Sequence, residues 1–206
     1  MVFGLGKPLA WAMSGLQTWL AEMSDTSAVL LGVLLGVMMC SDLGGPINKS
    51  AYLFATAGLA AQSGAAFSVM AATMAAGMVP PLGLALATVI RKNLFTANEQ
   101  QNGKAAWLLG FSFVTEGAVP FAASDPLRVL PATTLGGAVA GGLSMALHVG
   151  SRAPHGGIFV LFAMDNPLGF LAAVAAGTVT TAIVVIFLKA VVRRKNAGHK
   201  TAAAAA

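Results

Sequence analysis

Charged residues are confined to a few short segments of this chain, and this confinement limits what the chain can fold into. No Asp, Glu, Lys or Arg occurs in segments 50–90, 129–151 and 166–188, and only 9% of the 206 residues are charged. Soluble domains carry roughly 25% charged residues. About 20 apolar residues cross a bilayer as a helix. The sequence therefore predicts an all-α polytopic membrane protein, with one crossing in each of the last two segments.

The other apolar segments leave the number of crossings open. Segment 50–90 is long enough for two crossings, or for one crossing plus a hairpin. The Pro80-Pro81 pair predicts a kink or a break within it. Residues 28–40 are predicted to form a shorter membrane helix. Residues 8–23, with two tryptophans, resemble a short helix at the membrane interface.

Basic clusters predict the orientation of the crossings. Arg91-Lys92 and Arg193-Arg194-Lys195 lie at the ends of apolar runs, which is typical of the cytoplasmic side of a membrane. The chain must then cross an even number of times between them. Crossings near 129–150 and 167–190 meet this condition, so segment 105–124 is predicted to enter and leave on one side as a re-entrant hairpin. The net charge of +5 belongs to these clusters and does not indicate nucleic-acid binding. The tail, 196–206, is predicted to be disordered and cytoplasmic.

Three polar breaks interrupt the apolar chain, at 42–49, 112–128 and 152–157. Each combines Gly or Pro with a charged residue, and the last also contains a histidine. Broken membrane helices of this kind usually line a cavity, because their freed backbone groups need polar partners. The transmembrane helices are therefore expected to be interrupted by re-entrant hairpin-like breaks; their number, two, comes only from the resemblance given below.

Glu116 is the sharpest candidate for a functional residue. An ionisable group within an apolar membrane chain is costly, and it usually marks a functional site. A carboxylate can accept two hydroxyl groups at once, and the neighbouring Gly117 would let a ligand approach the backbone. Thr115 precedes it and offers a hydroxyl group. The structural alternative is an ion pair of Glu116 with Arg128 or Arg152.

Two other breaks supply weaker candidates. In the first, Asp42 precedes Lys49 by seven residues across a Gly-Gly-Pro turn, and Asn48 and Lys49 could donate hydrogen bonds to a polar substrate. The alternative is an ordinary loop with a snorkelling lysine. In the third break, His155 lies on a Gly-rich turn, where it could donate to a hydroxyl group or respond to pH.

The remaining polar residues point to structure rather than to chemistry. Asp125 and Arg128 are close enough in sequence to form a structural ion pair. Cys40 lies within an apolar helix and is predicted to be a small core residue. We find no P-loop, no Ser-His-Asp arrangement and no metal-ligand spacing. The sequence thus predicts no catalytic residue, no metal and no cofactor in this chain.

Five motifs occur in an order and spacing that resemble a known family, the IIC membrane domain of fructose-specific permeases of the bacterial phosphotransferase system. The resemblance covers roughly residues 1–192. The motifs are Asp42-Leu-Gly-Gly-Pro-Ile-Asn-Lys49, Met74-Ala-Ala-Gly-Met-Val-Pro-Pro81, Thr115-Glu-Gly-Ala-Val-Pro-Phe-Ala122, Asp125-Pro-Leu-Arg-Val-Leu-Pro131 and Ala153-Pro-His-Gly-Gly157.

The resemblance implies a function and a set of partners. In this family the IIC domain carries a sugar, typically fructose, across the inner membrane. A IIB domain, phosphorylated on a cysteine, transfers its phosphoryl group to the sugar. The wider superfamily is homodimeric, and its sugar-binding half contains two re-entrant hairpins and a sugar-binding Glu that Glu116 matches. Residues 1–195 would then form part of a IIC translocation domain. Its expected partners are fructose or a related sugar, a IIB domain, the N-terminal half of IIC and the lipid membrane.

Two departures from the family pattern leave alternatives open. IIC domains are longer than this chain, so a fragment, a split subunit and a degraded gene are all compatible with the sequence. Cys40 does not lie in a IIB-like loop, so no phosphoryl-carrying residue is expected here, and whether the chain acts as part of an enzyme stays open. Two other functions remain: an ion-coupled secondary transporter or channel that uses Glu116 and Asp125, and an inactive membrane scaffold.

Overall fold

The computed structural model describes residues 18, 22, 25–60 and 62–203, with side chains described as far as Val191. The helix expected over residues 8–23 lies almost wholly outside these residues, as do 204–206 of the predicted tail. The described chain is built of α-helices and short 3₁₀ helices, with a single antiparallel bridge between Ser151 and Met164. The elements are α2 (Asp25–Ser41), α3 (Pro46–Leu59), α4 (Gly64–Ile90), η1 (Lys92–Leu94), α5 (Ala97–Phe111), η2 (Thr115–Ala118), α6 (Val119–Ser124), α7 (Pro126–Ala146), η3 (Gly157–Ala163) and α8 (Pro167–Ala203).

Three of these helices are long and apolar enough to cross a membrane: α4, α7 and the stretch Pro167–Val191 of α8. Helix α2 is a shorter apolar helix. The predicted all-α membrane fold is confirmed, and α7 and α8 fall on the two predicted crossings. Segment 50–90 contains one long helix, α4, preceded by most of α3. With 14 residues, α3 is about 21 Å long and shorter than the roughly 30 Å hydrocarbon core of a bilayer.

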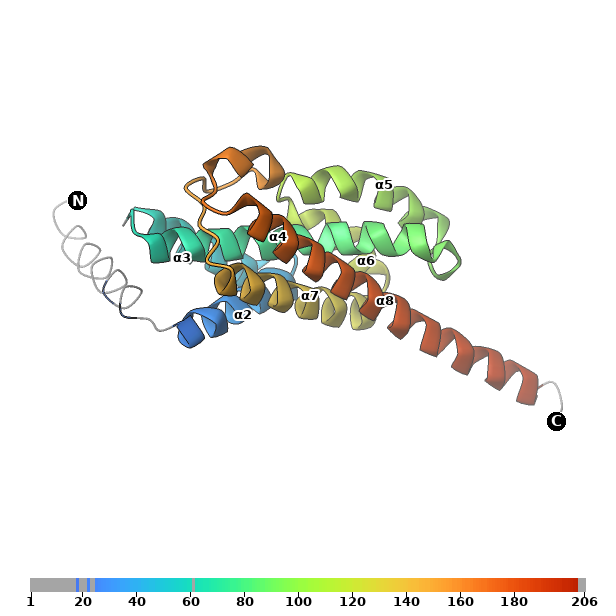
Figure 1. Cartoon of the computed structure of the whole chain (residues 1–206). Helices are drawn as coiled ribbons and strands as arrows, with labels where there is room; N and C mark the ends of the chain where they lie inside the picture. The colour runs from blue at the N-terminus through green and yellow to red at the C-terminus, as the bar shows by residue number, and fades with distance from the viewer. Residues whose placement is uncertain (1–17, 19–21, 23–24, 61, 204–206) are drawn as a thin grey trace, which may run out of the picture.

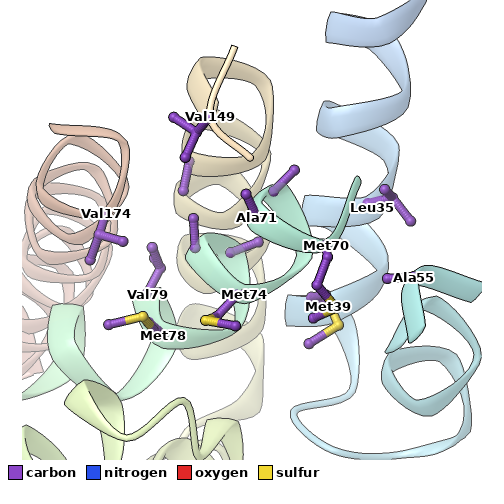
Figure 2. Packing of buried hydrophobic residues seen from close by; sticks show 14 of the residues in the cluster. Leu35, Met39, Ala55, Met70, Ala71, Met74, Met78, Val79, Val149 and Val174 are labelled. Carbon is purple, nitrogen blue, oxygen red and sulfur yellow. The ribbon is translucent and has the colours of Figure 1, made fainter. Parts of the chain in front are cut away.

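Helix α4 lies at the centre of the bundle and contacts α2, α3, α5, α7 and α8. Its side chains are buried around the whole circumference, as expected for a helix surrounded by other helices. Figure 2 shows Met70 close to Met39 of α2 and Ala55 of α3, while Met78 lies on the side nearer Val174 of α8. These neighbours fix α4 as the scaffold against which the polar breaks are placed.

Helices α2 and α7 approach so closely that only glycine fits between them. A Cβ atom on Gly36 would collide with the carbonyl group of Gly137, and one on Gly32 with that of Gly141. Small residues at such contacts let membrane helices pack by van der Waals contact along their backbones. This packing fixes the C-terminal end of α2, from which the first polar break begins.

The proline pair at 80–81, where a kink or a break was expected, does not break α4, which is one helix from Gly64 to Ile90. Each proline lacks an N–H, so the carbonyl groups of Ala76 and Gly77, four residues earlier, lose their helical partners. Both carbonyl groups find donors on other segments: Cys40 Sγ lies 3.2 Å from the Ala76 oxygen, and Thr115 Oγ1 lies 2.9 Å from the Gly77 oxygen. The prolines therefore leave the helix continuous and create two docking points on its surface.

Segment 97–124 folds back on itself as a helical hairpin. Helix α5 forms the outgoing leg, the chain turns at Phe113 with φ of 63°, and η2 and α6 form the returning leg. Both legs pack against each other, and α5 lies alongside the C-terminal half of α4 (Figure 1). That this hairpin enters and leaves the membrane on one side stays a prediction. Helix α8 is described through Ala203, so the predicted boundary at residue 195 does not coincide with a helix end.

Candidate functional site

A cavity of about 460 Å³ opens where the three polar breaks meet. It lies between the end of α2, the first turns of α3, the turn of the 97–124 hairpin and the loop that carries His155. The structure thus brings together candidates that are separated by up to about a hundred residues in sequence. The cavity is lined by Met39, Asn48, Lys49, Tyr52, Phe113, Val114, Thr115, Glu116 and His155.

The central polar contact of the cavity is an ion pair between Lys49 and Glu116. Lys49 Nζ lies 2.7 Å from Glu116 Oε1, and the two side chains are 55% and 47% exposed. Neither arginine considered as a partner for Glu116 is used, because Arg128 pairs with Asp125 and Arg152 pairs with Asp165. A carboxylate and an ammonium group therefore face the same open space and can offer both acceptors and donors to a ligand.

Glu116 is held in its ionised form. Partial burial alone would raise its pKa, but the hydrogen bond from Lys49, a backbone hydrogen bond, and the charges of Lys49 and His155 together hold the pKa below its ordinary value. Glu116 lies in η2, outside the three membrane-length helices. At neutral pH the cavity accordingly presents a negatively charged acceptor beside a positively charged donor.

Asp42 positions the start of α3 and does not line the cavity. Its two carboxylate oxygens accept hydrogen bonds from the backbone N–H groups of Ile47, at 2.7 Å, and Asn48, at 3.0 Å. An acidic cap of this kind satisfies N–H groups that have no partner within the helix. Asn48 lines the cavity, but its amide nitrogen donates to the Met39 carbonyl group at 2.6 Å. Both residues thus fix the direction in which Lys49 projects.

The turn before α3 also depends on glycine beside Glu116. Gly44 has φ of 107°, and a Cβ atom there would lie 2.7 Å from the Glu116 carboxylate. Glycine satisfies both the positive φ and the close approach. The first break and the hairpin turn therefore fit together at Gly44, next to the ion pair.

Thr115 and Gly117 flank Glu116 and attach the hairpin turn to its neighbours. Thr115 is buried, and its hydroxyl group donates to the Gly77 carbonyl group freed by the prolines of α4. Gly117 packs where a Cβ atom would press on Leu109 and Pro81. Gly117 is not among the cavity-lining residues. The structure thus uses both residues for packing around Glu116.

Three rings form one wall of the cavity, and two of them were not singled out from the sequence. The Phe113 ring lies 4.9 Å from the His155 ring and 6.0 Å from the Tyr52 ring, and Tyr52 meets His155 edge-on at 6.3 Å. One signal was available: Tyr52 is the only tyrosine of the chain, and it follows Lys49 by three residues, which places both on one face of a helix. The cavity thus combines a charged side with an aromatic side.

Asp125 and Arg128 lie outside the cavity, at the other end of the hairpin. Arg128 Nη1 is 2.6 Å from Asp125 Oδ2, and Lys189 Nζ is 3.6 Å from the same oxygen. Lys189 also pairs with Glu99 at 2.7 Å. Sequence reasoning did not single out Glu99 or Lys189. Among the described residues, no three His, Cys, Asp or Glu side chains are placed to hold a metal ion.

The fold and the cavity together define a class: a polytopic helical membrane protein with a small, half-open polar site at the turn of a helical hairpin. Comparison of its sequence with known proteins narrows this class. The chain is 49% identical over 192 residues to the "PTS system fructose-specific EIIB'BC component" of Escherichia coli strain K12, covering 92% of this chain and 34% of the relative. It is 48% identical over 190 residues to the "PTS system fructose-specific EIIC component" of Haloferax volcanii, covering 92% of this chain and 50% of the relative.

A third relative, the "Fructose permease IIC component" of Bacillus amyloliquefaciens, is 43% identical over 195 residues, with 95% of this chain and 63% of the relative covered. No protein-family model and no solved structure matches the chain. The chain spans about one third of the first relative and about half of the second. The chain is therefore homologous to part of the fructose-specific IIC components of the phosphotransferase system, and the resemblance inferred from its motifs is confirmed.

Proposed function

We propose that this chain is the sugar-binding part of a phosphotransferase permease that carries fructose across the bacterial inner membrane. The observation that carries the proposal is the Lys49–Glu116 pair, half exposed in a cavity of about 460 Å³. Small-molecule sites typically occupy roughly 300–1,000 Å³ and combine apolar walls with a few well-placed polar groups. The names of the relatives supply fructose as the sugar.

A sugar suits both sides of this cavity. Its hydroxyl groups can donate to the Glu116 carboxylate and accept from the Lys49 ammonium group, which are 2.7 Å apart. The C–H face of a sugar ring is apolar and fits the wall formed by Tyr52, Phe113 and His155. His155 can also donate to a hydroxyl group. In this proposal the sugar separates Lys49 from Glu116, and its hydroxyl groups take over the hydrogen bond that each side chain loses.

Phosphorylation requires a partner protein in this proposal. The one cysteine, Cys40, is buried and donates to the Ala76 carbonyl group, so it is unsuited to carry a phosphoryl group. We expect a IIB domain to phosphorylate the sugar, in keeping with the combined names of the relatives. We further expect the N-terminal half of IIC as a partner, a homodimer in the complete permease, and a cytoplasmic C-terminus next to the basic cluster at 193–195.

The energy source of uptake tests this function. The chain is reconstituted in vesicles together with an N-terminal IIC half, a IIB domain and the cytosolic phosphotransfer proteins. We expect fructose to accumulate as a sugar phosphate only when phosphoenolpyruvate is supplied. Uptake of unmodified sugar that collapses with the proton gradient would instead support an ion-coupled transporter. Asp125 gives that alternative little support, because it is paired with both Arg128 and Lys189.

A further inference from the structure

The hairpin that carries Glu116 begins at the start of α5 and ends after α6. These two ends, called its feet below, both contact one lysine. Glu99 lies in the first turn of α5, where the outgoing leg begins. Asp125 lies between α6 and α7, where the returning leg ends. Lys189 of α8 contacts both: its Nζ lies 2.7 Å from Glu99 Oε1 and 3.6 Å from Asp125 Oδ2. Glu116 lies in η2, after the turn that joins the two legs.

We propose that Lys189 is a positioning residue that ties the two feet of the hairpin together and thereby holds Glu116 in place. The tie itself depends only on contacts at the base of the hairpin. Its effect on sugar binding rests on the proposed function of Glu116.

The contacts at Lys189 form a closed, neutral set. Two acids, Glu99 and Asp125, face two bases, Lys189 and Arg128. The second oxygen of Glu99 accepts the backbone N–H of Thr96 at 2.7 Å, completing a capping box that starts α5. The Phe95 ring covers the ammonium group, with Nζ 4.5 Å from the ring centre.

Burial makes this set hard to open. The side chains of Lys189 and Glu99 are only 9% and 4% exposed, and that of Asp125 is 13% exposed. Removal of one partner from a buried ion pair leaves an uncompensated charge, which is strongly destabilising. Separation of the two feet would break one of the two Lys189 contacts; Asp125 would keep Arg128, whereas Glu99 has no other base among the described residues. The network therefore favours a single arrangement of the two legs. Because the turn joins the legs, its position is fixed with them.

Hydrogen exchange tests the tie without any sugar. The full chain is placed in lipid nanodiscs, and amide exchange is measured peptide by peptide. Because Lys189→Met leaves Glu99 buried without a base, we expect the amides of residues 112–118 to exchange about tenfold faster. Exchange in α2 and α3 should stay as in the unchanged chain, since a general loss of structure would accelerate it everywhere. Lys104→Met, an exposed lysine of α5, is the matched control and should change nothing at the turn.

Two further variants separate the charge from the shape of the side chain. Lys189→Arg keeps the positive charge and should restore slow exchange at residues 112–118. Glu99→Gln should accelerate exchange at the same amides, and the double variant Glu99→Gln/Lys189→Met should be no faster than Lys189→Met alone, because the two residues act as one pair. If Lys189→Met does not fold, Lys189→Arg and Glu99→Gln carry the same test. Unchanged exchange in Glu99→Gln, or rapid exchange in Lys189→Arg, would overturn the proposal.

Fructose binding then distinguishes the tie from the function. With both proposals correct, Glu99→Gln weakens fructose binding about tenfold or less, in step with its exchange rate. If exchange at the turn accelerates while fructose affinity stays constant, the tie stands and Glu116 is not the sugar site. If fructose affinity falls while exchange at the turn stays slow, the proposed role of Lys189 is wrong, and the assignment of Glu116 as the sugar-binding residue still stands.

Discussion

Two lysine–glutamate pairs in this molecule have the same length and opposite surroundings. Lys49–Glu116 and Lys189–Glu99 are both 2.7 Å apart, but the side chains of the first pair are 55% and 47% exposed and those of the second 9% and 4%. Exposed pairs are weak because water competes for both charges, whereas a buried pair is costly to break. The first pair is thus suited to be exchanged for a ligand, and the second to hold the hairpin.

The same contrast extends to what surrounds each pair. The Lys49–Glu116 pair borders an open cavity and an aromatic wall. The Lys189–Glu99 pair is enclosed by Asp125, by Phe95 and by the capping box of Thr96. At the turn of the hairpin, the charged groups are therefore accessible to a ligand. At its base, they are buried and paired with other protein groups.

The largest expected effect is on stability, and it should separate the two pairs. Lys189→Met should lower the free energy of unfolding by about 3–5 kcal/mol, the usual cost of breaking a buried pair. Lys49→Met should lower it by about 1 kcal/mol or less, as for other exposed pairs. Thermal or denaturant unfolding in nanodiscs measures both variants side by side. Equal losses of stability would remove the distinction between the two pairs.

A middle effect should come from the docking point between the hairpin turn and α4. Thr115→Val keeps the shape of the side chain but leaves the Gly77 carbonyl group without its donor, which costs about 1–3 kcal/mol. The turn would lose its hold on α4, and fructose affinity should fall with it. Thr115→Ser keeps the hydroxyl group and is the control, with near-normal binding expected. A Thr115→Val protein that binds fructose and unfolds as the unchanged chain does would show that this hydrogen bond is dispensable.

The smallest effect is expected at the aromatic wall. His155→Ala removes one ring that packs 4.9 Å from Phe113 and one possible donor, so we expect fructose affinity to fall by about fivefold, within the usual worth of about 1 kcal/mol for a hydrogen bond or an aromatic contact. His148→Ala is the matched control, because His148 is exposed and does not line the cavity. Binding isotherms at several pH values check both variants. A larger loss than that of a Glu116 variant would move the centre of the site to the aromatic wall.

The sequence predicted those features that follow from the free-energy cost of placing charged residues in a membrane. The confinement of charges predicted the membrane fold, and the expense of an acid in an apolar chain drew attention to Glu116. The basic clusters at 91–92 and 193–195 predicted that segment 105–124 turns back. The structure contains a hairpin at this place, with its legs in α5 and α6.

What the sequence could not predict depends on contacts between distant segments. Glu99 and Lys189 are 90 residues apart, and each looked like an ordinary charge at the edge of an apolar run. Lys49 was predicted as a substrate donor without any means of knowing that it meets Glu116. The prolines at 80–81 were expected to break or kink the helix. The donors that satisfy the freed carbonyl groups, Cys40 and Thr115, come from other segments, so the sequence alone could not show that the helix continues.

The most direct test of the account is the fructose affinity of a single pair of variants, measured by calorimetry in nanodiscs. Glu116→Gln keeps the shape of the side chain but loses one acceptor and the charge, so we expect affinity to fall about 10–100-fold, the worth of a hydrogen bond to a charged group. Asp165→Asn removes the acid of another half-exposed ion pair, with Arg152, outside the cavity, and should bind fructose normally. Unchanged affinity in Glu116→Gln, or an equal loss in both variants, would contradict the assignment of Glu116 as the sugar-binding carboxylate.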